Sequence, residues 1–353
     1  MAIGRRILEI NEILTQEKKS SKKEDKMEEK FPFERAQRKV LVKSEAESDK
    51  KFGCDPNKRP LKELITYGII NINKPQGPTS HQVADYVKKI LGLKHVGHSG
   101  TLDPNVTGSL IVALEDATRV VQNLLKAGKE YICLMHIHDK VDELKLKQVI
   151  NSFVTKIEQL PPRKSAVKRQ WRQREIYYIT ILEIKNQDVL FKVGCEAGTY
   201  IRKLCYDIGE KLKVGASMTQ LIRTRVGPFN ESTMFTLYQL KDAFESNNEK
   251  ELRKIIQPIE SAIKHLPKIW IYDEAIDSVC HGSVLAIPGI SKIESEIKEN
   301  DLIVVLTLKN ELVCTGNSLM SSEEILKEKK GIVVKPSKVY MKRNTYPKYN
   351  RKA

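Results

Sequence analysis

The segment Gly97-His98-Ser99-Gly100-Thr101-Leu102-Asp103-Pro104 constrains the fold of this chain more than any other. It predicts a tight turn, because glycines at 97, 100 and 108 permit positive φ angles or a close approach of the backbone. Pro104 disfavours the α conformation at the residue before it, so the carboxylate of Asp103 is held in a stiff loop. Asp-Pro beside glycine is also ordinary turn chemistry, and the segment alone is weak evidence for a catalytic acid.

The charge of the chain points to a polyanionic partner. Its 353 residues suggest about two domains, and 40% hydrophobic residues are enough to form cores. Lys and Arg number 61 against 45 Asp and Glu, a net charge of +16, and nucleic acid is the leading partner class for such a chain. A lysine-rich composition can instead reflect genome bias or growth at high temperature. The placement of the charges must decide between these interpretations.

The cysteines and the apolar runs indicate an intracellular protein. No CxxC pair occurs, which argues against a zinc ribbon and against a disulfide framework. We find no apolar run near the roughly 18 residues of a membrane span and no signal-peptide core, so we expect a cytoplasmic protein without a membrane partner. The scattered cysteines are Cys54, Cys133, Cys195, Cys205, Cys280 and Cys314.

Hydrophobic periodicity predicts alternating strands and helices in the first 265 residues. Residues 1–30 are expected to form a charged, mobile extension, and 31–60 an irregular segment with a strand-like run at 40–42. Thr79 or Ser80 is the expected N-cap of the first long helix. Strands are predicted at 68–73, 130–138, 177–184 and 189–193, and helices at 81–91, 116–126, 142–153 and 201–212.

A domain boundary is predicted near Leu266-Pro267. Beyond it the pattern changes to short β-type runs separated by glycine turns, which is typical of a small β-barrel of about eighty residues. These runs lie at 268–271, 284–287, 302–308, 312–314 and 331–334.

Two further patterns are candidate binding sites. His136 and His138 share one face of a predicted strand, but no carboxylate or cysteine at a suitable spacing completes a metal site, and we expect none. A stretch at 161–174 is basic, contains Trp171 and has no acidic residue, which favours contact with RNA over a merely solvated surface. Its cations are Arg163, Lys164, Lys168, Arg169, Arg172 and Arg174.

Four motifs in order resemble those of the TruB and dyskerin pseudouridine synthases. They lie at 73–81, 98–104, 129–131 and 195–202, and the C-terminal segment resembles a PUA domain. Ser165-Ala166-Val167-Lys168-Arg169, running into 171–178, is most similar to archaeal dyskerin homologues, the catalytic subunits of box H/ACA ribonucleoproteins. One departure is Ile222, where the family commonly has an arginine; this substitution could weaken a backbone contact.

The resemblance implies a fold and a division of the chain. An α/β (α+β) catalytic domain with a mixed, largely antiparallel sheet is expected over 61–265. The PUA β-barrel would occupy 266–346, with the segment 31–60 packed against it and a short basic tail at 347–353.

The resemblance also implies a chemistry. Members of the family isomerise uridine to pseudouridine in rRNA or tRNA without a cofactor. Asp103 would be the catalytic acid residue, Tyr131 would stack on the target base, and Arg202 would pair with Asp103. From the residues alone, Tyr131 could equally be a core tyrosine and Arg202 a surface arginine. Supporting residues would be Leu204, Gly100 and Thr101 at the substrate pocket, Lys74 and Pro75 behind the loop, and His98 as a structural hydrogen-bonding group.

The partners implied by the resemblance are a guide RNA and three proteins. The basic stretch would form a thumb loop over the substrate RNA, while Lys335, Lys338, Lys342 and Arg343 would bind the guide RNA. The proteins would be a small zinc-ribbon-containing subunit, a glycine-arginine-rich-type subunit and a kink-turn-binding ribosomal-protein homologue, in the cytoplasm or, in a eukaryote, the nucleolus. The alternatives are a guide-independent enzyme acting on the T-loop of tRNA and a non-catalytic RNA-binding scaffold.

Overall fold

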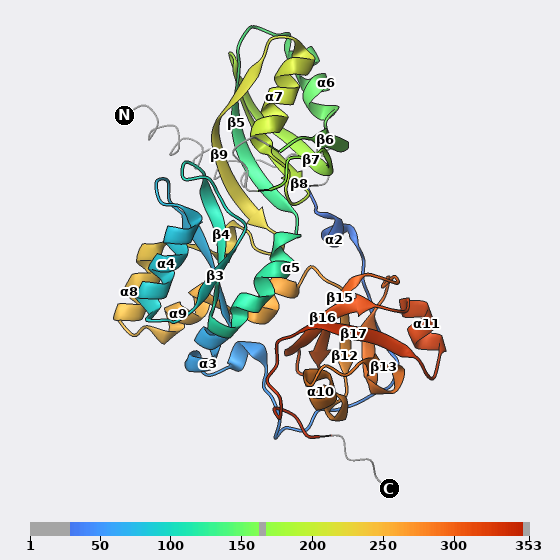
Figure 1. Ribbon diagram of the computed structural model, residues 1–353. Helices are drawn as coiled ribbons and strands as arrows, with labels where there is room; N and C mark the ends of the chain where they lie inside the picture. The colour runs from blue at the N-terminus through green and yellow to red at the C-terminus, as the bar shows by residue number, and fades with distance from the viewer. Residues whose placement is uncertain (1–28, 162–166, 349–353) are drawn as a thin grey trace, which may run out of the picture.

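Two β-sheets form the framework of the computed structural model, which describes residues 29–161 and 167–348 (Figure 1). Most of the extension expected at 1–30 and most of the tail expected at 347–353 therefore lie outside the described residues, as do Arg163 and Lys164. Within the described part, no helix is long and apolar enough to cross a membrane.

The larger sheet has ten strands and is mixed but mainly antiparallel, which confirms the expected fold class. The main path runs β10 (Met234–Phe235), β2 (Gly68–Lys74), β4 (Thr107–Leu114), β9 (Ala216–Val226), β5 (Lys129–Ile137), β8 (Asp188–Cys195), β7 (Arg172–Lys185) and β6 (Lys156–Gln159). Two strands lie beside this path, β11 (Ile256–Pro258) on β2 and β3 (Val96–Ser99) on β4. Among these described strands, only the pairs β10–β2 and β4–β9 are parallel.

One half of this sheet is buried on both faces. Ile70 and Ile72 of β2 face a core formed with the helices α4 (Ser80–Leu91), α8 (Leu237–Glu245) and α9 (Glu249–Ile255). Ile69, pointing the other way, joins a separate core. Alternate residues of a strand point to opposite faces, so an uninterrupted apolar run indicates burial on both sides. The strand predicted at 68–73 is confirmed for this reason.

The other half of the sheet is covered by α6 (Glu143–Asn151) and α7 (Ile201–Leu212), at the top of Figure 1.

The helix predicted at 201–212 is confirmed, but the helix predicted at 116–126 is wrong in its first half. That half is a 3₁₀ helix, Glu115–Val120, followed by α5 (Val121–Leu125). Glu115, the residue before the predicted start, has a φ of 40°, so the chain enters this segment from a non-helical conformation.

The smaller sheet has seven strands and forms the β-barrel-like part expected beyond residue 266, as a half-barrel. Its edge strand β1 (Val40–Val42) comes from the N-terminal segment and pairs with β14. Two helices complete this part, α10 (Asp273–Cys280) and α11 (Ser322–Lys327). The order is β1, β14 (Ile290–Glu294), β12 (Lys268–Ile271), β15 (Leu302–Thr307), β16 (Leu312–Ser318), β17 (Ile332–Val339) and β13 (Leu285–Ala286).

The two sheets are joined through a common apolar core. Val304 and Leu306 of β15 are buried in one cluster with Ile69 and Ile111 of the larger sheet. Burial of apolar side chains from both sides is typical of a fixed arrangement, since separating the two parts would expose them to water.

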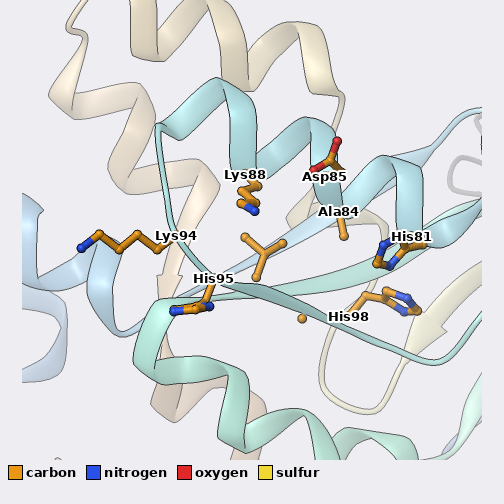
Figure 2. Close-up of a pocket in the computed structure, with 9 residues that line it drawn as sticks. His81, Ala84, Asp85, Lys88, Lys94, His95 and His98 are labelled. Carbon is orange, nitrogen blue, oxygen red and sulfur yellow. The ribbon is translucent and has the colours of Figure 1, made fainter.

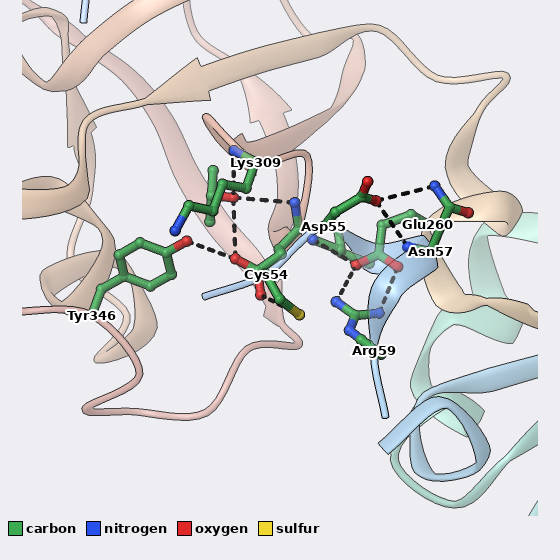
Figure 3. Close-up of polar contacts among 10 residues, drawn as sticks. Cys54, Asp55, Asn57, Arg59, Glu260, Lys309 and Tyr346 are labelled. Carbon is green, nitrogen blue, oxygen red and sulfur yellow. Dashed lines mark hydrogen bonds and ion pairs between the residues drawn. The ribbon is translucent and has the colours of Figure 1, made fainter. Parts of the chain in front are cut away.

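A polar seam reinforces this junction (Figure 3). Arg59 donates two hydrogen bonds of 2.8 Å to the carboxylate of Glu260, and both residues are buried. Glu260 also accepts a hydrogen bond from the backbone of Leu312, in the half-barrel. The Tyr346 hydroxyl donates to the buried carboxylate of Glu311 at 2.6 Å. The N-terminal segment thus links both sheets.

We predict that Arg59→Leu destabilises the protein by about 3–5 kcal/mol, because it leaves the Glu260 carboxylate buried without its cation. Thermal unfolding and denaturant titration would measure the loss. The double variant Arg59→Leu/Glu260→Leu should regain most of that stability. A double variant as unstable as the single one would contradict this account of the seam.

Candidate active site

The candidate active site lies where the two halves of the large sheet separate. The start of β4 pairs with β9 through two residues, Thr107 with Ile222 and Gly108 with Arg223, and the rest of β4 diverges from β9. The loop that carries Asp103 enters β4 at this point. The site is therefore built at a junction that leaves side chains accessible between the halves.

Two glycines shape the loop, not three. Gly100 has a φ of 78° and Gly108 a φ of 100°. A Cβ on Gly108 would lie 2.2 Å from the carbonyl oxygen of Arg223, so this position requires glycine. Gly97 has an ordinary φ, and its Cβ would meet nothing closer than 3.5 Å. The expected special role of Gly97 is therefore wrong.

Lys74 holds the loop from below, as expected from the sequence. Its ammonium group is buried and donates hydrogen bonds to the carbonyl oxygens of Pro75 at 2.9 Å, Pro104 at 3.1 Å and Val106 at 2.9 Å. Burial lowers the pKa of Lys74, while the charge of Asp103 acts in the opposite direction. Three hydrogen bonds satisfy this ammonium group without a carboxylate in contact.

The start of α4 fastens the other side of the loop. Thr79 caps the helix, its side chain accepting a hydrogen bond from the backbone of Gln82. Ser80, the other cap candidate, instead accepts a 2.8 Å hydrogen bond from the backbone N–H of Leu102. This buried contact was not predicted, because sequence spacing does not show which loop a hydroxyl will meet.

Asp103 forms an ion pair with Arg202 across the junction. The Nη2 atom of Arg202, at the second residue of α7, donates a 2.7 Å hydrogen bond to Oδ2 of Asp103. The side chain of Asp103 is 60% exposed and that of Arg202 is 62% exposed. Exposed ion pairs contribute little to stability, about 0–1 kcal/mol, so this pair is not explained by folding. It displays an oriented carboxylate to solvent.

Tyr131 lies on β5 opposite Arg223 of β9. Burial raises the pKa of the Tyr131 hydroxyl, and the charge of Arg223 and a hydrogen bond with it oppose this shift. Arg223 is 1% exposed and was not recognised in the sequence as part of the site. The available signal was its place in the segment Leu221-Ile222-Arg223-Thr224-Arg225, which the family resemblance had already singled out at Ile222.

Three buried cations surround the junction. Lys129 donates hydrogen bonds to the carbonyl oxygens of Leu124, Leu125 and Ala127, and burial lowers its pKa to about 7. Lys74 and Arg223 place positive charge behind the loop that carries the exposed carboxylate. Such a field favours a polyanion approaching this face.

The expected pocket residues have different environments. Gly100 and Thr101 lie in the Asp103 loop, with Thr101 exposed. Leu204 is completely buried in the core beneath α7, where it can support a pocket wall but not touch a ligand. His98 does not act as the expected hydrogen-bonding group, because its buried Nδ1 has no partner among the described residues. Burial lowers the pKa of His98.

A hollow of about 450 Å³ lies beside the loop, between α4 and the segment leading into β3 (Figure 2). His81 and His98 lie close together at one end, and His95 and Lys94 at the other. Asp103, Tyr131 and Arg202 do not line it.

The basic stretch is only partly a loop. Lys168 and Arg169 are exposed before the strand, whereas Arg172 and Arg174 belong to β7, which starts five residues earlier than predicted because it pairs with the unforeseen β6. Arg174 forms an ion pair of 3.2 Å with Glu196. The charge of Arg174 is therefore already paired with a carboxylate of this chain.

The cations near the C-terminus also differ in setting. Lys335 and Lys338 lie on β17, with Lys335 exposed, and Arg343 is exposed after it. Lys342 lies 3.4 Å from Asp116, in the 3₁₀ helix Glu115–Val120, and over the ring of Tyr67, just before β2.

The histidines considered for a metal have other partners. His136 Nδ1 lies 2.8 Å from an Asp188 carboxylate oxygen, and His138 contacts Ser217. Across 29–161 and 167–348, no group of three or more His, Cys, Asp or Glu is arranged to hold a metal ion.

Ile222 packs against a small apolar cluster formed by Ile132 of β5 and Leu190 of β8. An apolar residue therefore suits this position.

Four known domain families match this chain in succession from residue 28 to residue 340. The N-terminal domain of the TruB family of pseudouridylate synthases matches residues 88–201, and the C-terminal domain of tRNA pseudouridylate synthase B matches 202–264. A PUA domain matches 267–340 and a DKCLD domain 28–84.

Two relatives are similar to this chain over most of the length of both proteins. "Probable tRNA pseudouridine synthase B" of Pyrococcus horikoshii is 54% identical over 317 residues, 88% of this chain and 95% of that protein. The Methanopyrus kandleri protein of the same name is 50% identical over 90% of this chain and 95% of its own.

Two solved complexes contain similar chains. A Cbf5-Nop10-Gar1 complex includes a chain 52% identical to this one, with a TM-score of 0.86, covering 90% of this chain and 98% of that one. An H/ACA RNP bound to a substrate RNA containing 2′-deoxyuridine includes a chain 50% identical, with a TM-score of 0.85 and coverages of 91% and 100%.

We predict that Lys74→Met lowers the free energy of unfolding by about 2–4 kcal/mol, because three buried carbonyl groups lose their donor. Hydrogen exchange at the Val106 amide, which is bonded to Asp103 O, should accelerate. Lys89→Met, on the exposed face of α4, is the matched control and should leave both unchanged. Equal behaviour of the two variants would contradict the support role of Lys74.

Proposed function

The chain belongs to the TruB family of pseudouridylate synthases, and we propose that it isomerises uridine to pseudouridine in RNA as the catalytic subunit of a guide-RNA-directed H/ACA ribonucleoprotein. The observation that carries this proposal is the exposed Asp103 carboxylate, oriented by its ion pair with Arg202. The similarity of the chain to the catalytic chains of solved H/ACA complexes supports the guided mode.

In the reaction, the bond between ribose C1′ and uracil N1 breaks, the base rotates, and C1′ joins C5. The proton on C5 leaves and N1 gains a proton, so no cofactor is consumed. The Asp103 carboxylate would act as nucleophile or base, and Arg202 would hold it in one orientation. Tyr131 would stack on the detached base and keep it in place during the rotation.

The accessibility of the site fits an RNA substrate. A uridine within paired RNA is shielded, so the target must be unpaired or flipped out to reach the carboxylate. With about 60% of both side chains exposed, the ion pair is open to such a nucleotide. The RNA itself would then exclude water from the pair.

We assign RNA binding to two sets of cations. The exposed residues Lys168 and Arg169 would contact the substrate strand, with Arg163, Lys164, Arg172 and Arg174 extending this surface. Lys335, Lys338, Lys342 and Arg343 would contact the guide RNA beside the half-barrel. The ion pair of Arg174 with Glu196 makes Arg174 the weakest member of the first set.

The proposed assembly has three protein partners. Solved complexes of similar chains contain Nop10 and Gar1, and one contains a substrate RNA. We propose that a zinc-ribbon-containing subunit and a glycine-arginine-rich-type subunit bind this chain in the same way, and that a kink-turn-binding ribosomal-protein homologue joins through the RNA. The relatives named above are archaeal, and a cytoplasmic location fits this assembly.

A second candidate function is guide-independent modification of the tRNA T-loop. The names of the relatives, which refer to a tRNA pseudouridine synthase, favour it.

Purified protein should be incubated with tRNA alone, and separately with guide RNA, target RNA and the partner subunits, before pseudouridine is mapped chemically. Product on the guided target supports the proposal. Product on tRNA but never on the guided target would replace it by the second function.

We predict that Asp103→Asn lowers turnover by at least about 100-fold, because the amide cannot replace the carboxylate as nucleophile or base. RNA affinity and melting temperature should remain close to those of the wild type, since the Asp103 pair is exposed. Single-turnover assays, filter binding and thermal unfolding measure the three quantities. Substantial turnover by the folded variant would remove Asp103 from the mechanism.

We predict that Lys168→Ala/Arg169→Ala weakens substrate RNA binding several-fold. The slope of log affinity against log salt should fall by about 1.4, since each phosphate contact on a single strand contributes about 0.7. Lys241→Ala/Lys250→Ala, on α8 and α9, is the charge-matched control and should change neither value. Unchanged affinity and slope in the first variant would return these residues to the solvated surface.

A further inference from the structure

We infer that Arg223 is a positioning residue for the isomerisation, holding Tyr131 and the Asp103 loop in one arrangement through a single guanidinium group. This inference rests on the proposed function and assigns a role to a residue that never meets the substrate. Arg223 is 1% exposed and lies on β9, at the point where β9 meets the start of β4.

The contacts of Arg223 reach both sides of the junction. Its Nε donates a 2.7 Å hydrogen bond to the carbonyl oxygen of Ser109, on β4. Its Nη2 donates a 3.2 Å hydrogen bond to the carbonyl oxygen of Gly100, the residue with a φ of 78° at the start of the loop. The loop that presents Asp103 is thus connected to the strand that follows it.

The same side chain reaches the stacking residue. Arg223 is the cross-strand partner of Tyr131, and the charge of its guanidinium acts on the Tyr131 hydroxyl. A planar guanidinium has five N–H donors in a fixed geometry, so its two backbone contacts fix the plane of the group beside Tyr131. The proposed acid and the proposed stacking ring are therefore placed by a common group.

The energetics argue that this arginine is not present for stability alone. None of its hydrogen-bond partners within 29–161 and 167–348 is a carboxylate, and burial lowers its pKa. A buried cation is costly, and an apolar residue of similar volume would serve a purely structural role at least as well. The neighbouring Arg225 differs in that it forms an ion pair of 2.6 Å with Glu34 and covers the Phe31 ring.

Arg223→Lys is the principal test, because it keeps the charge but offers one nitrogen in place of three. We expect the single-turnover rate on saturating RNA to fall by about 100-fold, the scale of an ångström misplacement at a reacting centre. RNA affinity should stay within about threefold of the wild type. Arg225→Lys is the matched control, a half-buried arginine on the same strand, and should keep the wild-type rate whatever its melting temperature.

Chemical rescue separates positioning from general damage. In Arg223→Ala, added guanidinium chloride at millimolar concentration should restore part of the rate by occupying the vacated space, whereas urea and an equal concentration of sodium chloride should not. Restoration by none of the three, in a variant whose melting temperature shows it to be folded, would overturn the inference.

Tyr131→Phe alone provides a measurement that does not depend on how well Arg223→Lys folds, and a double-mutant cycle combines the two variants. If the guanidinium acts through the hydroxyl, Tyr131→Phe alone slows the reaction, and the losses from Tyr131→Phe and Arg223→Lys are less than multiplicative. A wild-type rate for Tyr131→Phe, or a wild-type rate for Arg223→Lys, overturns the inference while leaving the proposed function standing. Absence of product with the wild-type protein would instead overturn the proposed function, and this inference with it.

Discussion

The structure of the site depends on buried cations that bind backbone carbonyl groups. A loop that displays a carboxylate to solvent has few apolar contacts of its own, so it must be held from behind. Lys74 binds the carbonyl oxygens of Pro104 and Val106, and Arg223 binds that of Gly100. The carbonyl groups satisfy the cations without neutralising them. The loop is thereby rigid, and the positive charge remains available to attract RNA.

A second constraint is the fixed position of the half-barrel relative to the catalytic sheet. Guided modification requires RNA bound at one place to deliver a nucleotide at another, so the distance between the two must be constant. Buried apolar side chains from both sheets and the Arg59–Glu260 pair keep it so. The N-terminal segment adds to this junction, because it contributes β1 to the half-barrel and Arg59 to the seam.

Much of the fold could be predicted from local pattern, and the exceptions have physical reasons. The helix at 201–212 has strong amphipathic periodicity and was predicted to the residue. The strand β9 was not, because polar residues are mixed with apolar ones along it, and the placement of Arg223 and Arg225 depends on partners elsewhere in the chain. β7 was predicted too short for a related reason, since its basic start becomes a strand only by pairing with β6.

The sequence by itself determined the family and the loop that carries Asp103, because these are carried by residue types at short spacing within motifs. Tyr131 and Arg202 were named as companions of Asp103 only through the resemblance to that family. Only the tertiary structure decided that Arg202 meets Asp103, 99 residues away, and that Arg223 meets the Ser109 carbonyl, 114 residues away. Hydrogen bonds of this kind depend on which strands become neighbours. That choice is made by packing of the whole sheet, and no local pattern records it.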